Sequence, residues 1–373
     1  MGEDSLTTIG DRFSTKNNFD LIRLVAAVTV LVSHSWPLCG SNFEPFAFYL
    51  GGYDTGGGWA VSVFFIISGF LVTRSVEGRD IESYLMSRVL RIIPALAFVT
   101  LIETFVIGPI FFSGGFSKYI GAGALKHLLN INVFDIATEL PGVFSGLPSH
   151  LINGSLWTLP VECSFYVVLP FLAFSFFRNR FFTLFLIVFV AAGYTVMVVY
   201  GYDWANQGGL LFSSVPLFYG LKSFLFFLAG SALWIWRRSV PFSPGLAICA
   251  VLLLVAAHEG YAARPAYHIA LPYLTIYLAV SAPIAGPILA RVGDLSYGTY
   301  LFAFPIQQAV LATAGTQIGP IGLALAALPI TLPVAFLSWK LVEQPALLLK
   351  RRLASNRPAK RSDSILQKTT AAD

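Results

Sequence analysis

Charged residues are scarce in this chain of 373 residues. Asp, Glu, Lys and Arg together make up 12% of it, against roughly 25% in an average soluble domain. Hydrophobic residues make up 56%, and the mean hydropathy is +0.73. This combination excludes a soluble globular enzyme, a disordered regulator and a nucleic-acid-binding domain. The net charge of +5 is modest, so we expect no nucleic acid among the partners.

Cysteine is scarce as well. Cys39, Cys163 and Cys249 have no spacing typical of a metal or redox site, and an odd number cannot form a closed set of disulfides. We therefore expect no metal. The first eighteen residues are polar and lack the apolar core and cleavage site of a signal peptide, so the first apolar segment is expected to stay in the protein.

Long apolar segments, in contrast, are abundant. A membrane-spanning helix needs about 20 apolar residues, and ten runs are candidates for such spans. They lie near residues 19–39, 59–75, 92–112, 157–177, 181–200, 212–236, 244–258, 268–288, 296–315 and 321–340. Pro216, Gly220 and Lys222 interrupt the sixth run, which would be typical of a broken or re-entrant helix. The pattern predicts an all-α, polytopic membrane protein of about ten transmembrane helices.

The distribution of Lys and Arg predicts the orientation, because cytoplasmic loops retain positive charge. With the N-terminus inside, nearly all of these residues fall on the inner side, and only Lys118, Lys126 and Arg264 fall outside. Both termini are therefore predicted to be cytoplasmic. We expect a cytoplasmic segment over residues 1–18, a membrane domain over 19–349 and a basic cytoplasmic tail over 350–373, disordered or lying on anionic lipid.

The first apolar run contains three ionisable groups, Asp20, Arg23 and His34. Such groups cost about 2.5–3.5 kcal/mol inside a span, so they usually face the protein interior. Arg23 and His34 are eleven residues apart, which puts them on one helix face about 16 Å apart along the axis. Snorkelling to the inner headgroups explains Arg23 alone, and a structural hydrogen bond explains His34 alone. Their shared face favours a functional role for both.

A basic pair, Arg88 and Arg91, precedes the third run in the segment SRVLRIIP. Residues three apart lie on one helix face, where two guanidinium groups can bind phosphate. The positive-inside bias alone would also place arginines here, as it does Arg74. If the pair binds a ligand, we expect an anionic cytosolic cofactor.

The fourth run begins SLWTLPVECSFY and places Glu162 about five residues inside the outer boundary, at the depth of His34. A carboxylate beside an imidazole can fix its tautomer and raise its basicity, as a general base requires. The structural alternative is a buried Glu162 satisfied by the backbone or by Trp157.

The remaining polar groups of the apolar runs have simpler interpretations. Ser68 and Gly69 permit close helix packing. Glu103 is a buried acid in the third run, and the sequence does not identify its partner. The other histidines lie in outer loops or at span ends and are expected to be ordinary solvated residues: His127, His150, His258 and His268.

Six segments together resemble the acyltransferase type 3 family of bacterial membrane-bound O-acyltransferases. They are FDLIRLVAAVTVLVSH, FFIISGFLVTRS, SRVLRIIP, SLWTLPVECSFYVVLP, LSYGTYLFAFPIQQ and LVEQPALLLKR. Each motif is weak by itself, but all six occur in the expected order over residues 19–349. One departure is Ala303, where many members have a histidine, which weakens any role for Tyr300 or Gln308.

The resemblance implies roles for individual residues. His34 would be the catalytic histidine, with Arg23 as its motif partner and Glu162 in the acidic position of the tryptophan-containing motif. Arg88 and Arg91 would contact the phosphates of acyl-CoA, together with Arg23 or Arg74. Four further residues are expected to support the site: Asp20, Ser68, Trp157 and Tyr166.

The resemblance further implies an enzyme of the bacterial inner membrane. It would transfer an acyl group, usually acetyl, from cytosolic acyl-CoA to a hydroxyl group of a cell-surface or lipid-linked glycan. Some family members modify small molecules such as macrolides instead. The ionisable residues of the spans also suit a transporter or flippase, and a non-catalytic scaffold is a further alternative. The sequence gives no indication of the oligomeric state.

Overall fold

A computed structural model describes residues 7–49, 51–201, 210–211, 215–258, 262–284 and 291–355, and these fold almost entirely into helices. The α-helices are α1 (Ile9–Arg12), α2 (Phe19–Leu38), α3 (Pro45–Tyr49), α4 (Gly56–Val76), α5 (Ile81–Ile102), α6 (Gly108–Phe111), α7 (Phe116–Gly121), α8 (Thr158–Arg178), α9 (Phe181–Val199), α10 (Leu217–Ile235), α11 (Pro244–Ala256), α12 (Ala263–Val280), α14 (Ser296–Ala314), α15 (Gly319–Ser338) and α16 (Gln344–Ser355). Two π-helical segments, η1 (Glu103–Ile107) and η5 (Trp339–Glu343), and three 3-10 segments, η2 (Ala124–Ile131), η3 (Gly154–Trp157) and η4 (Thr316–Ile318), adjoin them. A short antiparallel pair, β1 (Leu210–Leu211) and β2 (Val215–Pro216), precedes α10.

Helices occupy the positions of all ten predicted spans, which confirms an all-α membrane protein. By length and composition, seven helical segments of the described chain can cross a membrane. The other three positions hold α11, which has only 13 residues, and α12 and α14. The sequences of these last two helices contain residues such as Arg264, Gln307 and Gln308. The chain is therefore multi-pass, and the count of about ten spans stays a prediction.

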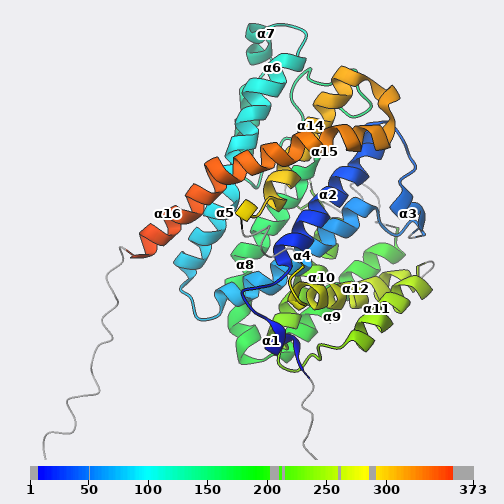
Figure 1. Ribbon diagram of the computed structural model, residues 1–373, viewed down its shortest axis with the longest axis vertical. Coiled ribbons are helices and arrows are strands. Elements are labelled where there is room, and N and C mark those ends of the chain that lie inside the picture. Colours follow the sequence, from blue (N-terminus) through cyan, green and yellow to red (C-terminus); the bar gives the residue numbers. More distant parts are fainter. Residues whose placement is uncertain are drawn as a thin grey trace, which may run out of the picture.

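The long predicted outer segment and the predicted N-terminal segment lie at opposite ends of the molecule (Figure 1). Helices α6 and α7, from the long predicted outer segment, lie at one end, and α1 lies at the other (Figure 1). Between these ends, helices such as α8, α9 and α11 expose large apolar side chains, among them Phe171, Phe189 and Ile248. Such an apolar surface suits contact with lipid. The backbone hydrogen bonds of these helices form within each helix, as a membrane requires.

Helix α4 lies at the centre of the bundle, and 67% of its most apolar stretch is buried. It packs against α10 through glycines on both helices. A Cβ atom on Gly69 would lie 2.0 Å from the backbone oxygen of Phe227, and one on Gly230 would lie 2.1 Å from that of Ile66. The expected role of Gly69 in close helix packing is thus confirmed, because only glycine permits this approach.

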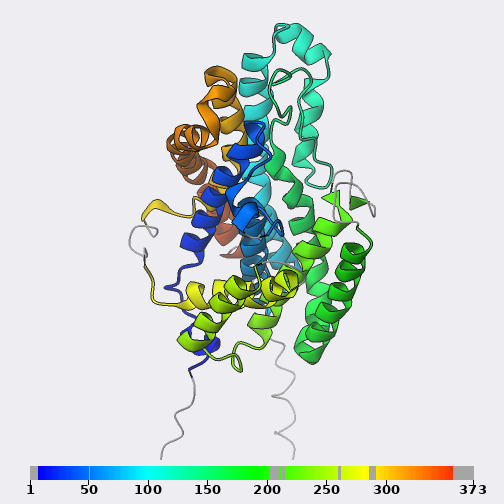
Figure 2. The same cartoon turned by 90° about the vertical axis from the view of Figure 1, so that its right-hand side faces the viewer.

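Helix α10 is continuous, so the expected break in the sixth span is absent (Figure 2). Pro216 precedes the helix as its N-cap residue, and Gly220 accommodates the side chain of Leu211. Lys222 points into the protein, where its Nζ atom lies 2.5 Å from Oδ2 of Asp54. The charge that seemed to interrupt the span is therefore neutralised by a residue that precedes α4.

The structure describes part of each predicted terminal segment. In the predicted N-terminal segment, α1 is held by a capping box between Thr8 and Asp11, and the backbone nitrogen of Ile9 donates to the carbonyl oxygen of Val240. At the other end, α16 runs to Ser355, so the first six residues of the predicted tail are helical. Residues 1–6 and 356–373 lie outside the described residues.

The Asp54–Lys222 pair yields a prediction about stability. Both side chains are nearly buried, with 10% and 9% exposed, so removing one partner leaves an uncompensated charge, at a cost of about 3–5 kcal/mol. Lys222→Met should therefore lower the unfolding temperature in detergent. The double variant Lys222→Met/Asp54→Leu should recover most of the loss. An unchanged unfolding temperature for the single variant would contradict this role.

Candidate functional site

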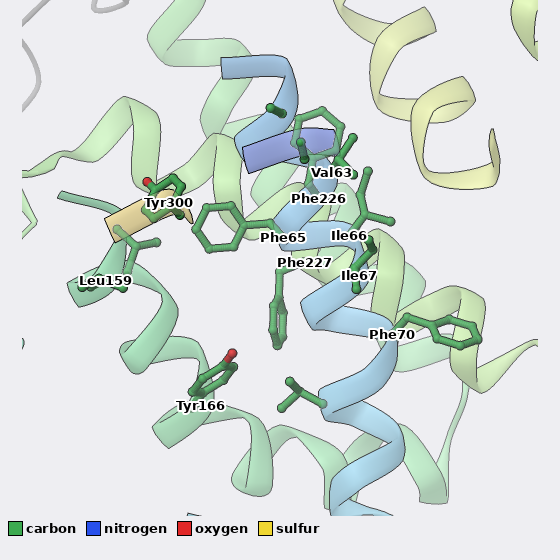
Figure 3. Packing of buried hydrophobic residues seen from close by; sticks show 14 of the residues in the cluster. Val63, Phe65, Ile66, Ile67, Phe70, Leu159, Tyr166, Phe226, Phe227 and Tyr300 are labelled. Atoms are coloured by element: carbon green, nitrogen blue, oxygen red, sulfur yellow. The ribbon is translucent and has the colours of Figure 1, made fainter. Parts of the chain in front are cut away.

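A cavity lies between α2, α4, α5, α8 and α14. Its wall on α4 extends from Val61 to Val72, a length of about 16 Å at 1.5 Å per residue. Figure 3 shows Phe65 of this wall pointing toward Leu159 of α8 and Tyr300 of α14. The cavity is therefore a long slot inside the predicted membrane domain, lined mainly by apolar side chains on α4 and by many polar or charged side chains on the other helices.

Three of the predicted arginines gather on the wall of this cavity. Arg23 comes from α2, and Arg88 and Arg91 come from adjacent turns of α5. The guanidinium group of Arg88 lies 5.6 Å from the ring centre of Tyr166 and 6.0 Å from that of Tyr84. Arg88 and Arg91 thus line the same cavity, as their shared helix face led us to expect, and Arg23 lines it from α2. Three cations in a small volume create a strong preference for an anion.

A buried carboxylate that the sequence analysis missed holds two of these arginines. Oδ2 of Asp294 accepts a hydrogen bond from Arg91 and lies 3.2 Å from Nη2 of Arg23. Oδ1 accepts from the backbone nitrogen and the hydroxyl group of Ser296, at 3.1 and 2.5 Å. The available signal was the single acid in the segment GDLSYG, just before α14 on the side of the arginines.

The pKa of Asp294 reflects this environment. Burial alone would raise the pKa of the carboxyl group, but the charges of Arg23 and Arg91 and the hydrogen bonds from Ser296 and Arg91 hold it well below its ordinary value. Asp294 lies in the segment between α12 and α14, with only 8% of its side chain exposed. It is therefore an anion in the folded protein and offsets part of the positive charge at this end of the cavity.

A second polar group lies further along the cavity wall. The hydroxyl group of Tyr166 donates to Oε1 of Glu162, and Ser68 of α4 lies 3.2 Å from the Tyr166 hydroxyl and 3.5 Å from the same carboxylate oxygen. All three residues line the cavity. The structure thus brings together the predicted residues Ser68, Glu162 and Tyr166, and the carboxylate faces the slot.

The expected contact between His34 and Glu162 is absent. No hydrogen bond joins these two residues, both of which the structure describes, and His34 does not line the cavity. Its ring instead packs edge-on against Phe304, with ring centres 5.3 Å apart, and its Nδ1 atom is buried without a hydrogen-bond partner. The expectation rested on equal depth in the membrane, which does not determine the direction in which each helix face points.

His34 nevertheless lies close to the outer end of the cavity. Tyr300 forms part of the cavity wall, and Phe304, which contacts His34, is four residues further along α14. Four residues correspond to about 6 Å along a helix. The residue that His34 contacts is therefore about one helical turn from the cavity wall, while Arg23, on the same helix as His34, lines the basic end of the cavity.

Three other predicted site residues lie away from the cavity wall. Arg74 stacks on the ring of Phe13, 4.6 Å from its centre. Trp157 packs against Tyr219, with ring centres 5.7 Å apart. Asp20 forms an ion pair with Arg23 but does not itself line the cavity. Of these three, only Asp20 is thus connected to the site, through the arginine that it contacts.

His127 is not a solvated histidine, contrary to the expectation. It is 2% exposed, and its Nε2 atom lies 2.9 Å from Oε2 of Glu103, which is completely buried. Asn153 donates a hydrogen bond of 2.7 Å to the other oxygen of Glu103. The acid without an identified partner thus joins η1, which follows α5 directly, to η2 of the predicted outer segment. His268 also differs from the expectation, because its ring stacks on Phe226 at 4.6 Å.

Comparisons with known proteins agree with this architecture. The model of a family described as "Acyltransferase domain" matches residues 16–340. An O-acetyl transferase of Shigella phage Sf6 is 31% identical, with 88% of this chain and 95% of the phage protein covered. Nodulation protein 10 of Rhizobium leguminosarum bv. viciae is 29% identical, with 92% and 96% covered. No solved structure matches the chain.

A third relative shares only part of its length. Peptidoglycan O-acetyltransferase OatA of Listeria monocytogenes is 26% identical over 43% of this chain and 24% of the relative. The fold and cavity define a multi-pass membrane protein with an internal slot lined in part by arginines. The family match adds the chemistry: the chain belongs to the acyltransferase family that its six motifs resemble, and it is a membrane acyltransferase.

The lowered pKa of Asp294 predicts a pH dependence of stability. Because the pKa is lower in the folded than in the unfolded chain, Asp294 stabilises the fold at pH values above its ordinary pKa of 3.8. This contribution is lost as the pH falls below that value. Asp294→Asn should unfold at a lower temperature than the wild type at pH 6, and the gap should narrow toward pH 3. A gap independent of pH would contradict the assignment.

Proposed function

We propose that the protein is an O-acetyltransferase of the bacterial inner membrane. It transfers an acetyl group from cytosolic acetyl-CoA to a hydroxyl group of a cell-surface or lipid-linked glycan. The observation that carries this proposal is the cavity of an acyltransferase-family chain in which Arg23, Arg88 and Arg91 meet at one end. On the predicted topology, that end faces the cytoplasm, where acyl-CoA is present.

The charge and length of the cavity suit an acyl donor that has an anionic end and a long neutral arm. Guanidinium groups bind phosphate through charge-assisted hydrogen bonds, so the phosphates of acetyl-CoA would bind at the arginines. The slot continues from there for about 16 Å along α4 between Phe65, Leu71 and Leu159. The pantetheine arm would lie in this slot and carry the thioester past Ser68 toward the outer end.

His34 would act as the general base. In the proposed step, a ring nitrogen of His34 removes the proton from the acceptor hydroxyl group while the oxygen attacks the thioester carbonyl. The carbon–sulfur bond breaks, and the proton passes to the sulfur of the departing CoA. The position of His34, against a residue about one turn from the slot, suits a base that meets an acceptor arriving from the outer side. An acetyl-histidine intermediate would use the same geometry.

Glu162 would have a different role from the one expected. It faces the slot through its hydrogen bonds with Tyr166 and Ser68 rather than holding the ring of His34. From there it can orient the donor arm through hydrogen bonds and so align the thioester, which is a contribution of geometry. Arg74 and Trp157 would have structural roles.

The glycan acceptor is suggested by relatives. One is named an O-acetyl transferase and another a peptidoglycan O-acetyltransferase. A hydroxyl group of a polysaccharide or of its lipid-linked precursor would reach His34 from the outer side and from the surrounding lipid. The experiment below distinguishes a glycan acceptor from a small molecule such as a macrolide, and acetyl transfer from transport without transfer.

Acetyl transfer can be measured in sealed membrane vesicles that receive labelled acetyl-CoA on the cytoplasmic face. Wild type should place the label on glycan as an alkali-labile ester. His34→Ala should lose most turnover, about 10²–10⁴-fold, because general-base catalysis is worth that much. His150→Ala, which changes an exposed histidine of the outer segment, serves as the matched control. Equal labelling by His34→Ala would exclude His34 as the base.

If the label appeared in a soluble small molecule instead of glycan, that small molecule would be the acceptor and the glycan assignment would be wrong. Movement of glycan across the membrane without any ester would contradict acetyl transfer and favour a transporter.

The donor site makes a separate prediction. Arg88→Ala should raise the apparent KM for acetyl-CoA about tenfold or more, since loss of a charge-assisted hydrogen bond costs about 1.5–3 kcal/mol. Arg74→Ala should leave KM nearly unchanged, because Arg74 stacks on Phe13 outside the slot. Initial rates at varied acetyl-CoA concentration test both. A larger effect of Arg74→Ala would place the donor phosphates elsewhere.

A further inference from the structure

The three arginines of the cavity are not equivalent. Arg91 and Arg23 each contact Asp294, and Arg23 also contacts Asp20. Arg88, in contrast, forms no ion pair with any residue that the structure describes, and its Nε atom is buried without a hydrogen-bond partner. The Nε atom of Arg23 is likewise buried and without a partner. Two N–H groups that can donate hydrogen bonds thus remain without an acceptor at the basic end of the slot.

Asp294 is held rigidly enough to fix its arginines. The preceding residue, Gly293, has φ +93°, a conformation that favours glycine, and a Cβ atom there would lie 2.0 Å from the indole nitrogen of Trp339. On the other side, Ser296 donates two hydrogen bonds to Oδ1 at the start of α14. Backbone and side chain of Asp294 are therefore both restrained, and Oδ2 is left facing the two guanidinium groups.

The consequence concerns repulsion among cations. Without an anion between them, the guanidinium groups of Arg23 and Arg91 would repel each other in a site from which water is largely excluded. Oδ2 of Asp294 bridges them, so both stay directed at the basic end of the slot when no ligand is bound. Arg88 lies beside this bridged pair and keeps its full positive charge for an incoming anion.

We infer that Asp294 is a positioning residue of the donor site: it clamps Arg91 and Arg23, and this leaves Arg88 and the Nε atom of Arg23 to contact the phosphates of the donor. This inference rests on the proposed function, because it names acetyl-CoA as the ligand. It goes further in dividing the arginine pair of α5 into a contacting residue, Arg88, and a clamped residue, Arg91.

A comparison of two acyl donors distinguishes this role from a merely structural one. Acetyl-CoA carries phosphates, whereas S-acetyl-pantetheine is the same thioester arm without them. With the purified full-length protein, Asp294→Asn should raise KM for acetyl-CoA about tenfold and leave kcat and the KM for S-acetyl-pantetheine nearly unchanged. Asp294→Glu should restore part of the loss. Asp11→Asn, which changes an exposed acid of α1, is the control.

A double-mutant cycle tests the clamp itself. If Asp294 acts through Arg91, the variant Asp294→Asn/Arg91→Ala should raise KM for acetyl-CoA no more than the larger single effect, because the two residues act as one unit. The pair Asp294→Asn/Arg88→Ala should instead lose both contributions. Three results would overturn the inference: a lower KM in Asp294→Asn, equal effects on both donors, or additive effects with Arg91→Ala.

Two further measurements keep the inference testable. If Asp294→Asn does not fold, Ser296→Ala replaces it, since loss of a hydrogen bond to Oδ1 should loosen the same carboxylate and raise KM for acetyl-CoA alone. Calorimetric binding of CoA separates this inference from the proposed function. Binding weakened by Asp294→Asn, without acetyl transfer by the wild type, would refute only the function. Absence of CoA binding by the wild type would refute both.

Discussion

The pairing of buried charges is the constraint on which this structure depends. Within a membrane no water is available to solvate an ion, so an ionised side chain is costly unless another group of the protein or a ligand offsets its charge. Asp294 meets this need for Arg23 and Arg91, and Asp54 meets it for Lys222. Because the partners come from segments far apart in the sequence, each pair also determines which helices are neighbours.

The charge pairs have different consequences at the two ends of the molecule. Asp54, just before α4, and Lys222 of α10 form a pair of one charge of each sign, which locks two helices. Around Asp294, Arg23 and Arg91 are paired with Asp20 and Asp294, whereas Arg88 forms no ion pair with a residue that the structure describes. An excess of one sign in a buried site is unfavourable unless a ligand completes it. The same kind of interaction thus serves two purposes. The balanced pair Asp54–Lys222 stabilises the fold, and the group around Asp294 leaves a positive charge for a ligand.

The fold could be predicted from the sequence to a large extent because apolar length and Lys/Arg bias are local properties. They located helices at all ten positions, and the three-residue spacing of Arg88 and Arg91 agrees with their place on one cavity wall. Contacts between helices were harder, since they depend on rotation about each helix axis. For this reason His34 and Glu162 were paired by depth although their side chains lie apart.

Partners that lie in connecting segments were harder still to predict. The acid Glu103 meets His127 from a 3-10 segment, and Asp294 reaches the arginines from a short connection before α14. No periodic pattern governs such segments, so the sequence gives no measure of which way they fold. Arg74 illustrates the reverse error: its place on the basic side was correct, yet stacking on Phe13 holds it away from the slot.

The glycine contacts between α4 and α10 have a consequence for how a ligand enters. At Gly69 and Gly230 the two backbones touch, and no side chain remains between them to be compressed or turned. The backbone that carries the α4 wall of the slot is therefore fixed in place. The facing wall consists of long side chains such as Arg88 and Tyr166, which can change rotamer without moving a helix. Admission of a ligand is thus a matter of side-chain rearrangement on α5 and α8, against an unyielding α4.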